Sequence, residues 1–251
     1  MANQLRTRGS VRTAVVWQTL RQVLTGLERQ AGSSGLDILD AGGGTGGFAV
    51  PLAQLGHRVT VVDPSPDALA ALERRAAETA VTELVRPILG DTAELLDLVG
   101  ESAADLVLCH GVLEFVEEPA EALRAVHRAL RAHGVASVLA ANRTAAVLAR
   151  ALGGHFADAR QTLTDPAGRW GSADLMPRRF SPDQLTELVE SAGLRIRQVQ
   201  GVRVFSDLVP GAVLDSEPGS ADQLLALESQ VADDPAFQAF ATQLHLLAGR
   251  A

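Results

Sequence analysis

A glycine-rich run from Leu39 to Gly47 constrains the fold of this chain more than any other feature of its sequence. It follows a strand-like run (36–40) and precedes a helical pattern (48–55). Glycines at such a junction permit tight turns and let backbone N–H groups approach a ligand closely. Gly42, Gly44 and Gly47 fit the spacing of dinucleotide-binding loops, which is weak evidence on its own. The run predicts a strand, loop and helix that bind a nucleotide-like ligand.

Strand-like apolar runs alternate with helical patterns along most of the chain. The strand-like runs cover residues 36–40, 58–63, 85–89, 105–110, 135–141, 194–205 and 240–247. Such alternation is typical of a parallel sheet with crossover helices on both faces. We therefore predict an α/β fold with a Rossmann-like, seven-stranded, mostly parallel sheet. The last run is expected to pair antiparallel at the edge of the sheet, although a helix is the alternative there.

Three segments fall outside this alternation. Residues 11–29 carry apolar side chains at helical spacing, which predicts a helix within an N-terminal extension (1–34). Residues 143–180 are richer in Gly, Pro and polar residues, and we interpret them as an insertion over the carboxyl edge of the sheet. Residues 210–220 are expected to be irregular. We predict that the whole chain (1–251) forms a single domain.

Three acidic residues follow successive predicted strands. Asp40 lies two residues before the first glycine, where an anion would repel a pyrophosphate and attract a cationic ligand group. Asp63 ends the next strand, where a carboxylate can accept hydrogen bonds from both hydroxyls of a ribose. Asp91 follows the third strand and could accept from an adenine amino group. The alternative is that Asp40 and Asp91 only cap helices or turns.

Composition excludes several classes of function. The chain has a formal net charge of -8, which argues against wide, non-specific nucleic-acid binding, yet arginines outnumber acids over residues 143–203. Cys109 is the single cysteine, so no internal disulfide forms, and the histidines show no metal-binding spacing. No apolar run has the length of a signal peptide or a membrane span, so we expect a cytoplasmic protein.

The glycine-rich run together with Asp63 resembles the first two motifs of class I S-adenosylmethionine (SAM)-dependent methyltransferases. Further segments resemble the bacterial tRNA carboxymethoxyuridine carboxyl methyltransferases, and these cover most of the chain. They are residues 11–22 (VRTAVVWQTLRQ), 106–115 (LVLCHGVLEF), the strand from Gly134 that ends in Ala141-Asn142, and 201–205 (GVRVF) with Asp207.

The resemblance implies SAM as the cofactor and a role for each matching residue. Arg12 would reach the carboxylate of SAM, and the Gly42, Gly43 and Gly44 loop would hold its methionine moiety beside Asp40. The expected ribose and adenine ligands are Asp63, Asp91, Thr92 and Ala93, and His110 is expected near the sulfonium.

The acceptor side carries no motif of a general base, nucleophile or metal site, so no catalytic residue is assigned. A carboxylate acceptor is already an anionic nucleophile at pH 7, and it needs a cationic clamp rather than a base. The candidate clamp residues are Arg203, Arg178 and Arg179, with Asn142 as a polar lining residue.

Four functions stay open at this point, and the sequence predicts no oligomeric state. The leading one is methylation of the carboxyl group of a modified tRNA uridine. The alternatives are methylation of a small-molecule carboxylate or hydroxyl, an NAD-binding oxidoreductase, and a SAM-binding module without activity. Asp63 would serve NAD and SAM equally, whereas Asp40 favours SAM because SAM carries an ammonium group and no phosphate.

Overall fold

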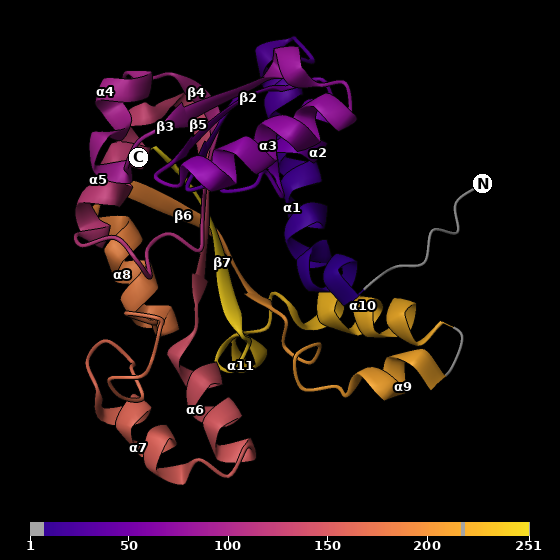
Figure 1. The fold of residues 1–251 in the computed structure, drawn as a ribbon, viewed down its shortest axis with the longest axis vertical. Helices are drawn as coiled ribbons and strands as arrows, with labels where there is room; N and C mark the ends of the chain where they lie inside the picture. The colour runs from indigo at the N-terminus through magenta and orange to yellow at the C-terminus, as the bar shows by residue number, and fades with distance from the viewer. Residues whose placement is uncertain (1–7, 217–218, 251) are drawn as a thin grey trace. The chain divides into compact units, whose positions relative to one another are not determined.

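The computed structural model describes residues 8–216 and 219–250 (Figure 1). The strands are β1 (Asp37–Ala41), β2 (Arg58–Asp63), β3 (Val85–Leu89), β4 (Ala104–His110), β5 (Leu130–Ala141), β6 (Leu194–Val202) and β7 (Gln243–Arg250). The helices are α1 (Arg8–Ala31), α2 (Ala49–Gln54), α3 (Pro66–Glu78), α4 (Leu95–Val99), α5 (Pro119–Ala129), α6 (Arg143–Leu152), α7 (Phe156–Thr164), α8 (Pro182–Ser191), α9 (Gly211–Ser216), α10 (Ser220–Val231) and α11 (Pro235–Gln238), with short 3-10 turns η1 (Thr82–Leu84) and η2 (Thr92–Glu94).

The described strands form a seven-stranded sheet in the order β3-β2-β1-β4-β5-β7-β6. Strands β1 to β5 pair in parallel. The order reverses between β1 and β4, and right-handed crossovers then place the helices before and after the reversal on opposite faces. The predicted Rossmann-like sheet is confirmed. Such a reversal opens a crevice at the carboxyl ends of the strands, where ligands of these folds bind.

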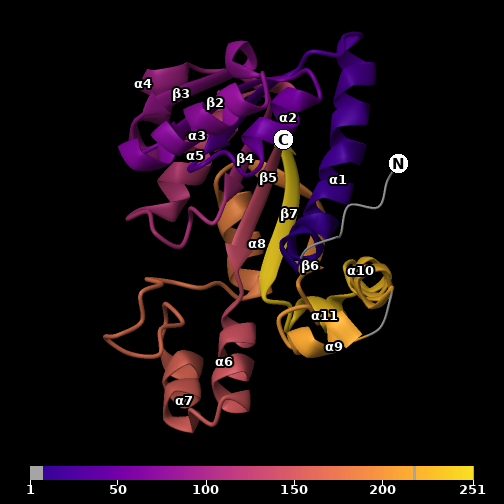
Figure 2. The same cartoon turned by 45° about the vertical axis from the view of Figure 1, so that its right-hand side comes forward.

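Strand β7 lies between β5 and β6, and Figure 2 shows it beside β5. It runs antiparallel to both neighbours. Thr242, which precedes β7, accepts a bond from Asn142 at the end of β5 and donates one to Arg203 at the end of β6. The antiparallel strand predicted for 240–247 is confirmed, but its place at the edge was wrong, because β6 takes the edge. Sequence periodicity does not encode the order of strands.

The residue contacts of the chain group into two compact units. Unit 1 comprises Met1–Gln22, Ala140–Leu185 and Gln198–His245. Unit 2 comprises Val23–Leu139, Thr186–Arg197 and Leu246–Ala251. The single domain expected over 1–251 therefore stays a prediction, and each unit is described by itself below.

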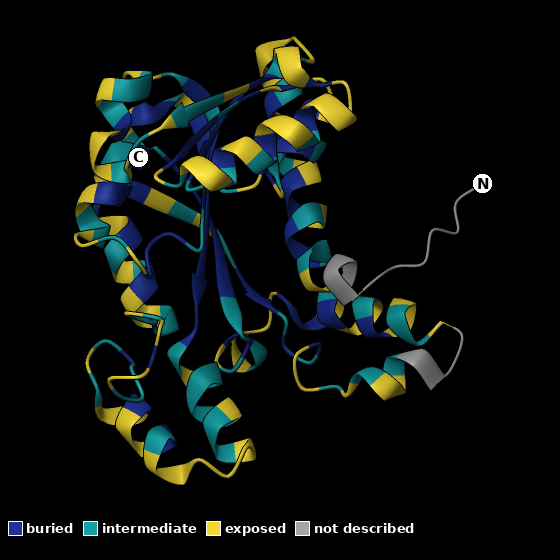
Figure 3. Ribbon diagram, viewed as in Figure 1, coloured by how far each residue is buried: buried dark blue, intermediate teal, exposed yellow. Residues whose placement is uncertain are grey.

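The core of unit 2 consists of the apolar strands β1 and β4 with the buried faces of their helices (Figure 3). Helix α3 shows how the sequence builds this layer. Ser65 caps its first turn by accepting from the amide of Ala68 at 3.2 Å, and Pro66 supplies the fixed φ of the first helical residue. Leu69, Leu72 and Ala76 then recur on the face that is buried against the sheet.

The insertion (143–180) belongs to unit 1 and contains helices α6 and α7. Its two ends meet, because Phe180 donates to the carbonyl of Ala141 at 2.9 Å and accepts from the amide of Arg143 at 2.9 Å. The segment therefore starts and finishes at the carboxyl end of β5. That it lies over the carboxyl edge of the parallel strands stays a prediction.

Two helices can be compared with what the sequence predicted for their segments. The helix predicted over 11–29 is confirmed as α1, which begins at Arg8. The irregular stretch predicted over 210–220 was wrong, because α9 forms there from Gly211 to Ser216. Pro210 and the flanking glycines concealed a run of only six helical residues. None of the helices in the described residues has the length and apolar character needed to cross a membrane.

Candidate functional site

The glycine-rich loop joins β1 to α2 at the carboxyl edge of unit 2. Gly42 donates its amide to the carbonyl of Val62 at 2.7 Å and has a φ of 74°. A β-carbon on Gly42 would collide with the side chain of Val112. Gly46 has a φ of 77°, and a β-carbon there would collide with Leu72, whereas nothing lies within 4 Å of one on Gly47. At Gly42 and Gly46, as at Gly43 below, a side chain would therefore clash with its neighbours, whereas the third glycine of the dinucleotide pattern has open space around it.

The carboxyl group of Asp40 lies directly against the backbone of Gly43. A β-carbon on Gly43 would be 2.5 Å from Asp40 Oδ2 and 2.9 Å from Val61 Cγ1. The Asp40 side chain is buried, being 3% exposed. Burial, with a smaller contribution from the nearby charge of Asp63, raises the pKa of Asp40 to about 7. A bound cation would favour its ionised form, which suits the predicted ammonium partner.

Asp63 joins the loop to the turn that follows β2. Its Oδ2 accepts from the amide of Gly44 at 2.8 Å, and its Oδ1 accepts from the amide of Ser65 at 2.9 Å. Each carboxylate oxygen can accept more than one hydrogen bond, so both remain able to bind ribose hydroxyls. Asp63 therefore shapes the loop in addition to its expected role as a ligand, and replacing it would disturb both.

The third acid, Asp91, caps η2. Its Oδ1 accepts from the amide of Ala93 at 3.0 Å and from the hydroxyl of Thr92 at 3.1 Å. These three residues line one end of a cavity of about 810 Å³ in unit 2, together with Leu96 and the exposed ring of Phe115. Asp91 therefore caps this turn, and its role toward adenine stays a prediction.

His110 ends β4, one strand away from the loop. Its Nε2 lies 2.8 Å from the hydroxyl of Ser137, and its half-buried ring stacks edge-on against Phe48 with centroids 4.7 Å apart. The carboxyl ends of β1, β2, β3 and β4 therefore present the predicted cofactor residues at one edge of unit 2. Arg12 belongs to unit 1, where it pairs with Asp207 at 2.7 Å.

Three of the four predicted acceptor residues line one pocket of about 260 Å³ in unit 1. They are Arg203, Arg179 and Asn142, and Met176, Phe240 and Thr242 complete the apolar and polar walls. Arg178 is half-buried and is not among the lining residues. The structure thus brings together residues that lie some sixty positions apart in the sequence.

Asn142 lines this pocket, as expected, and its amide nitrogen is engaged with backbone carbonyls. Its Nδ2 donates to the carbonyls of Gln238, Ala239 and Ala241 at 3.1, 3.1 and 2.9 Å. Its Oδ1 accepts from the amide of Thr144 and caps α6. Asn142 is 1% exposed. Because its donors are engaged with backbone carbonyls, Asn142 shapes the pocket wall.

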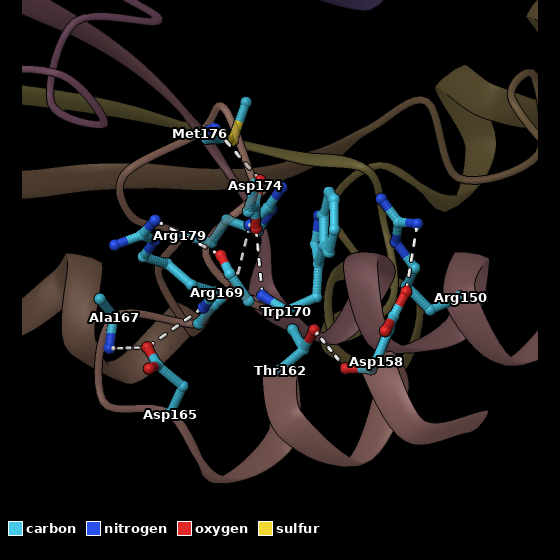
Figure 4. A network of polar contacts seen from close by, with 12 residues as sticks. Arg150, Asp158, Thr162, Asp165, Ala167, Arg169, Trp170, Asp174, Met176 and Arg179 are labelled. Carbon is cyan, nitrogen blue, oxygen red and sulfur yellow. Dashed lines mark hydrogen bonds and ion pairs between the residues drawn. The ribbon is translucent and has the colours of Figure 1, made fainter. Parts of the chain in front are cut away.

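Arg179 organises the loop that follows α7 (Figure 4). Its guanidinium binds both carboxylate oxygens of Asp174, at 2.6 and 3.1 Å, and also the carbonyl of Gly168 at 3.0 Å. Asp174 accepts in addition from the amides of Trp170 and Met176. Burial alone would raise the pKa of Asp174, but these hydrogen bonds and Arg179 hold it below its usual value. Arg179 is therefore mainly structural.

Replacing Asp174 by alanine should loosen this loop, because the buried guanidinium of Arg179 would lose its counter-ion. Breaking one side of a buried ion pair costs about 3–5 kcal/mol. Denaturant unfolding and limited proteolysis of residues 165–179 would measure the effect. Asp158→Ala is the matched control, since Asp158 is a third exposed and pairs with Arg150 at 3.5 Å. Equal losses in both variants would contradict the role given to Asp174.

Arg203 adopts a left-handed conformation with a φ of 59°, which is unusual for a residue with a β-carbon. Its side chain is 21% exposed and lies 3.5 Å from Asp207. Its buried Nε has no hydrogen-bond partner within the described residues. Burial lowers the pKa of Arg203, and Asp207 partly offsets this; the guanidinium remains charged. Arg203 thus lines this pocket and carries a buried Nε that no described residue binds.

Sequence reasoning assigned no role to several residues that shape these sites. The side chain of Val112 packs against Gly42, and the carboxylate of Asp174 binds the guanidinium of Arg179. The carboxylate of Glu228 binds backbone amides of the segment after Arg203. Glu228 carries a signal that could have revealed it. It lies four residues after Leu224 and three before Val231, so it places an acid on the apolar face of α10.

Comparisons with known proteins agree with this geometry. A model of the methyltransferase domain matches residues 39–138, which include the glycine loop and β4. The tRNA 5-carboxymethoxyuridine methyltransferase of Escherichia coli K12 is 32% identical over 201 residues, which cover 80% of this chain and 74% of that one. The chain belongs to the SAM-dependent methyltransferases. SAM is the cofactor, so the nicotinamide and non-catalytic alternatives are set aside.

Other relatives act on different acceptors. The ubiquinone biosynthesis O-methyltransferase of Methylobacterium nodulans is 32% identical over 200 residues, which cover 78% of this chain and 74% of that one. A SAM-dependent methyltransferase structure from Mesorhizobium loti matches with a TM-score of 0.62 and 21% identity over 96% of this chain and all of that one, which shows the shared fold. Among the described residues, no three His, Cys, Asp or Glu side chains come together to hold a metal ion.

Proposed function

We propose that the enzyme methylates the carboxyl group of 5-carboxymethoxyuridine in tRNA. The observation that carries this proposal is the partly buried Arg203, which lines a pocket of about 260 Å³ and whose Nε has no hydrogen-bond partner among the described residues. A guanidinium binds a carboxylate through two parallel hydrogen bonds, so the pocket suits a carboxylate acceptor. The extended similarity to the tRNA methyltransferase of Escherichia coli supports the nucleic-acid substrate.

The reaction needs alignment more than acid–base chemistry. When bound, SAM would supply an electrophilic methyl group, which a carboxylate oxygen of the acceptor could take in line, with formation of the O–CH₃ bond of a neutral ester and cleavage of the S–CH₃ bond to give a neutral thioether. Opposite charges are lost together in the transition state, so exclusion of water accelerates the step. Arg203 would hold the other oxygen, and the glycine loop with Asp40 and Asp63 would hold SAM.

The second candidate is methylation of a small-molecule carboxylate or hydroxyl. The ubiquinone O-methyltransferase relative favours it, because it has the same 32% identity as the tRNA enzyme and covers 78% of this chain, against 80% for the tRNA enzyme. A hydroxyl acceptor must lose a proton during transfer and therefore needs a base, whereas a carboxylate does not. The need for a base thus separates a hydroxyl acceptor from both carboxylate acceptors, and the identity of the labelled product separates the tRNA from a small molecule.

The test is methyl incorporation from labelled SAM into tRNA that contains 5-carboxymethoxyuridine. We expect label in this tRNA and an about 10- to 150-fold lower kcat/KM for Arg203→Ala, since a hydrogen bond to a charged group contributes about 1.5–3 kcal/mol. Arg160→Ala is the matched control, because Arg160 is an exposed arginine of α7 in the same unit. Label that enters only a small-metabolite extract would contradict the tRNA substrate and support the second candidate.

A further inference from the structure

The segment Arg203–Asp207, which follows β6, is held by a buried acid from α10. Glu228 is 1% exposed, although it lies on a helix that is otherwise amphipathic. Burial of a carboxylate is costly unless hydrogen bonds replace its water. Among the described residues, the hydrogen bonds of the Glu228 carboxylate come from the residues that directly follow Arg203.

Glu228 accepts four hydrogen bonds from three consecutive residues. Its Oε2 accepts from the amide of Val204 at 2.9 Å. Its Oε1 accepts from the amide of Phe205 at 3.0 Å and from the amide and hydroxyl of Ser206, both at 2.7 Å. A run of amides that converges on one carboxylate fixes the path of the backbone over these residues.

The same path fixes Arg203. The carbonyl of Arg203 accepts from the amide and the hydroxyl of Thr242, at 3.2 and 3.0 Å. The residue is thus anchored on both sides while its φ is 59°, a conformation that costs about 1 kcal/mol or more for a residue with a β-carbon. Such a conformation persists only where its surroundings enforce it.

We propose that Glu228 is a positioning residue, which holds Arg203 in the left-handed conformation that directs its guanidinium to the acceptor carboxylate. This inference rests on the proposed function, because it assigns Glu228 to the same acceptor pocket. Val204 on this segment packs with Val231 and Ala241, and Phe240 joins that cluster and lines the pocket. The carboxylate thus connects the pocket wall to the hydrophobic core of unit 1.

A purely structural role for Glu228 predicts a different result from a positioning role. If Glu228 is only structural, its replacement lowers the stability of unit 1, and the resulting loss of activity adds to the loss caused by replacing Arg203. A positioning residue acts on acceptor binding only while Arg203 is present. A double-mutant cycle separates the two, because residues that act through each other are not additive.

The experiment measures tRNA methylation and SAM affinity for Glu228→Gln, Arg203→Ala and the double variant. Glutamine keeps the size of the side chain but turns one acceptor oxygen into a donor that opposes a backbone amide. We expect Glu228→Gln to raise the KM for tRNA about 10-fold, to leave SAM affinity unchanged, and to have no further effect when Arg203 is already alanine. An equal loss with and without Arg203 would overturn the proposal.

Two further variants keep the test decisive. If Glu228→Gln folds poorly, Ser206→Ala takes its place in the test. It removes one donor to Glu228 Oε1 without removing the carboxylate, and it should raise the KM for tRNA two- to threefold. Thr19→Val breaks a buried bond to Gln200 in unit 1 and should lower stability without changing that KM. Failure of the unsubstituted enzyme to methylate this tRNA contradicts the proposed function, whereas additive losses contradict only the role of Glu228.

Discussion

Replacing Asp40 by asparagine is expected to stabilise the free enzyme by about 2–4 kcal/mol at pH 8 and to weaken SAM binding at least 10-fold. The side chain is buried, and its pKa rises from 3.8 to about 7. Each unit of this shift corresponds to about 1.4 kcal/mol, so an ionised Asp40 costs about 4 kcal/mol of stability. Asparagine has the same shape and removes the charge, together with its attraction for the ammonium group of SAM.

The raised pKa of Asp40 also makes the stability of the folded protein depend on pH. Between pH 4 and pH 7 the unfolded chain has lost the Asp40 proton, whereas the folded chain still holds it, so stability falls as the pH rises. The loss is complete above pH 7, and the variant should show none of it over the same window. SAM affinity of the unsubstituted enzyme should increase from pH 6 to pH 7.5, because binding favours the ionised form.

Denaturant unfolding at pH 4, 6 and 8 and calorimetric titration with SAM would measure both effects. Asp67→Asn is a suitable control, because Asp67 is an exposed acid in the first turn of α3. Stability of Asp40→Asn that matches the unsubstituted enzyme at pH 8 would argue that Asp40 is not ionised there in the free protein. Unchanged SAM affinity would show that the charge of Asp40 does not contribute to binding of the ammonium group of SAM.

Substitution of Gly43 by alanine should lower SAM affinity at least 100-fold and stability by about 1–3 kcal/mol. The new β-carbon would lie 2.5 Å from Asp40 Oδ2 and 2.9 Å from Val61 Cγ1, and both atoms belong to buried side chains of the sheet. Neither neighbour can move far in a close-packed core, so the loop backbone must move instead. The amides of the loop would then no longer face the ligand.

Gly47→Ala is the matched control for this substitution. It adds the same methyl group four residues further along the loop, where nothing lies within 4 Å of the new atom. We expect SAM affinity and stability close to those of the unsubstituted enzyme. Calorimetric titration with SAM would measure the affinity of both variants. Equal affinities would mean that the absence of a side chain at Gly43 is not needed for cofactor binding.

Much of the fold follows from local patterns. The strand ends at Asp63 and His110 were predicted correctly, because a continuous apolar run that stops at a polar residue marks a buried parallel strand, whereas β1 ends at Ala41, one residue after the predicted Asp40. The place of β7 could not be predicted, since strand order depends on packing between segments that are distant in sequence. Helix α9 was missed because six residues between Pro210 and Gly219 are too few to show a helical period.

The site was predictable in residue identity and less so in role. Asp63 and the glycines lie where the motif places them, because the loop has little freedom between β1 and α2. The roles of Asn142 and Arg179 could not be read from sequence, since no periodic pattern marks the partners of either side chain. Asn142 binds carbonyls close to a hundred positions away, and Arg179 binds a carboxylate within its own loop.

The meeting of Ala141, Arg143 and Phe180 has a consequence for how such enzymes diversify. A segment whose two ends are joined by neighbouring backbone hydrogen bonds can be lengthened, shortened or exchanged with little effect on the strands that flank it. New acceptor specificity can therefore arise in evolution by replacing residues 143–180 as a cassette, while the glycine loop and its acids stay as they are. Engineered chimaeras between relatives should place their junctions at these same two positions.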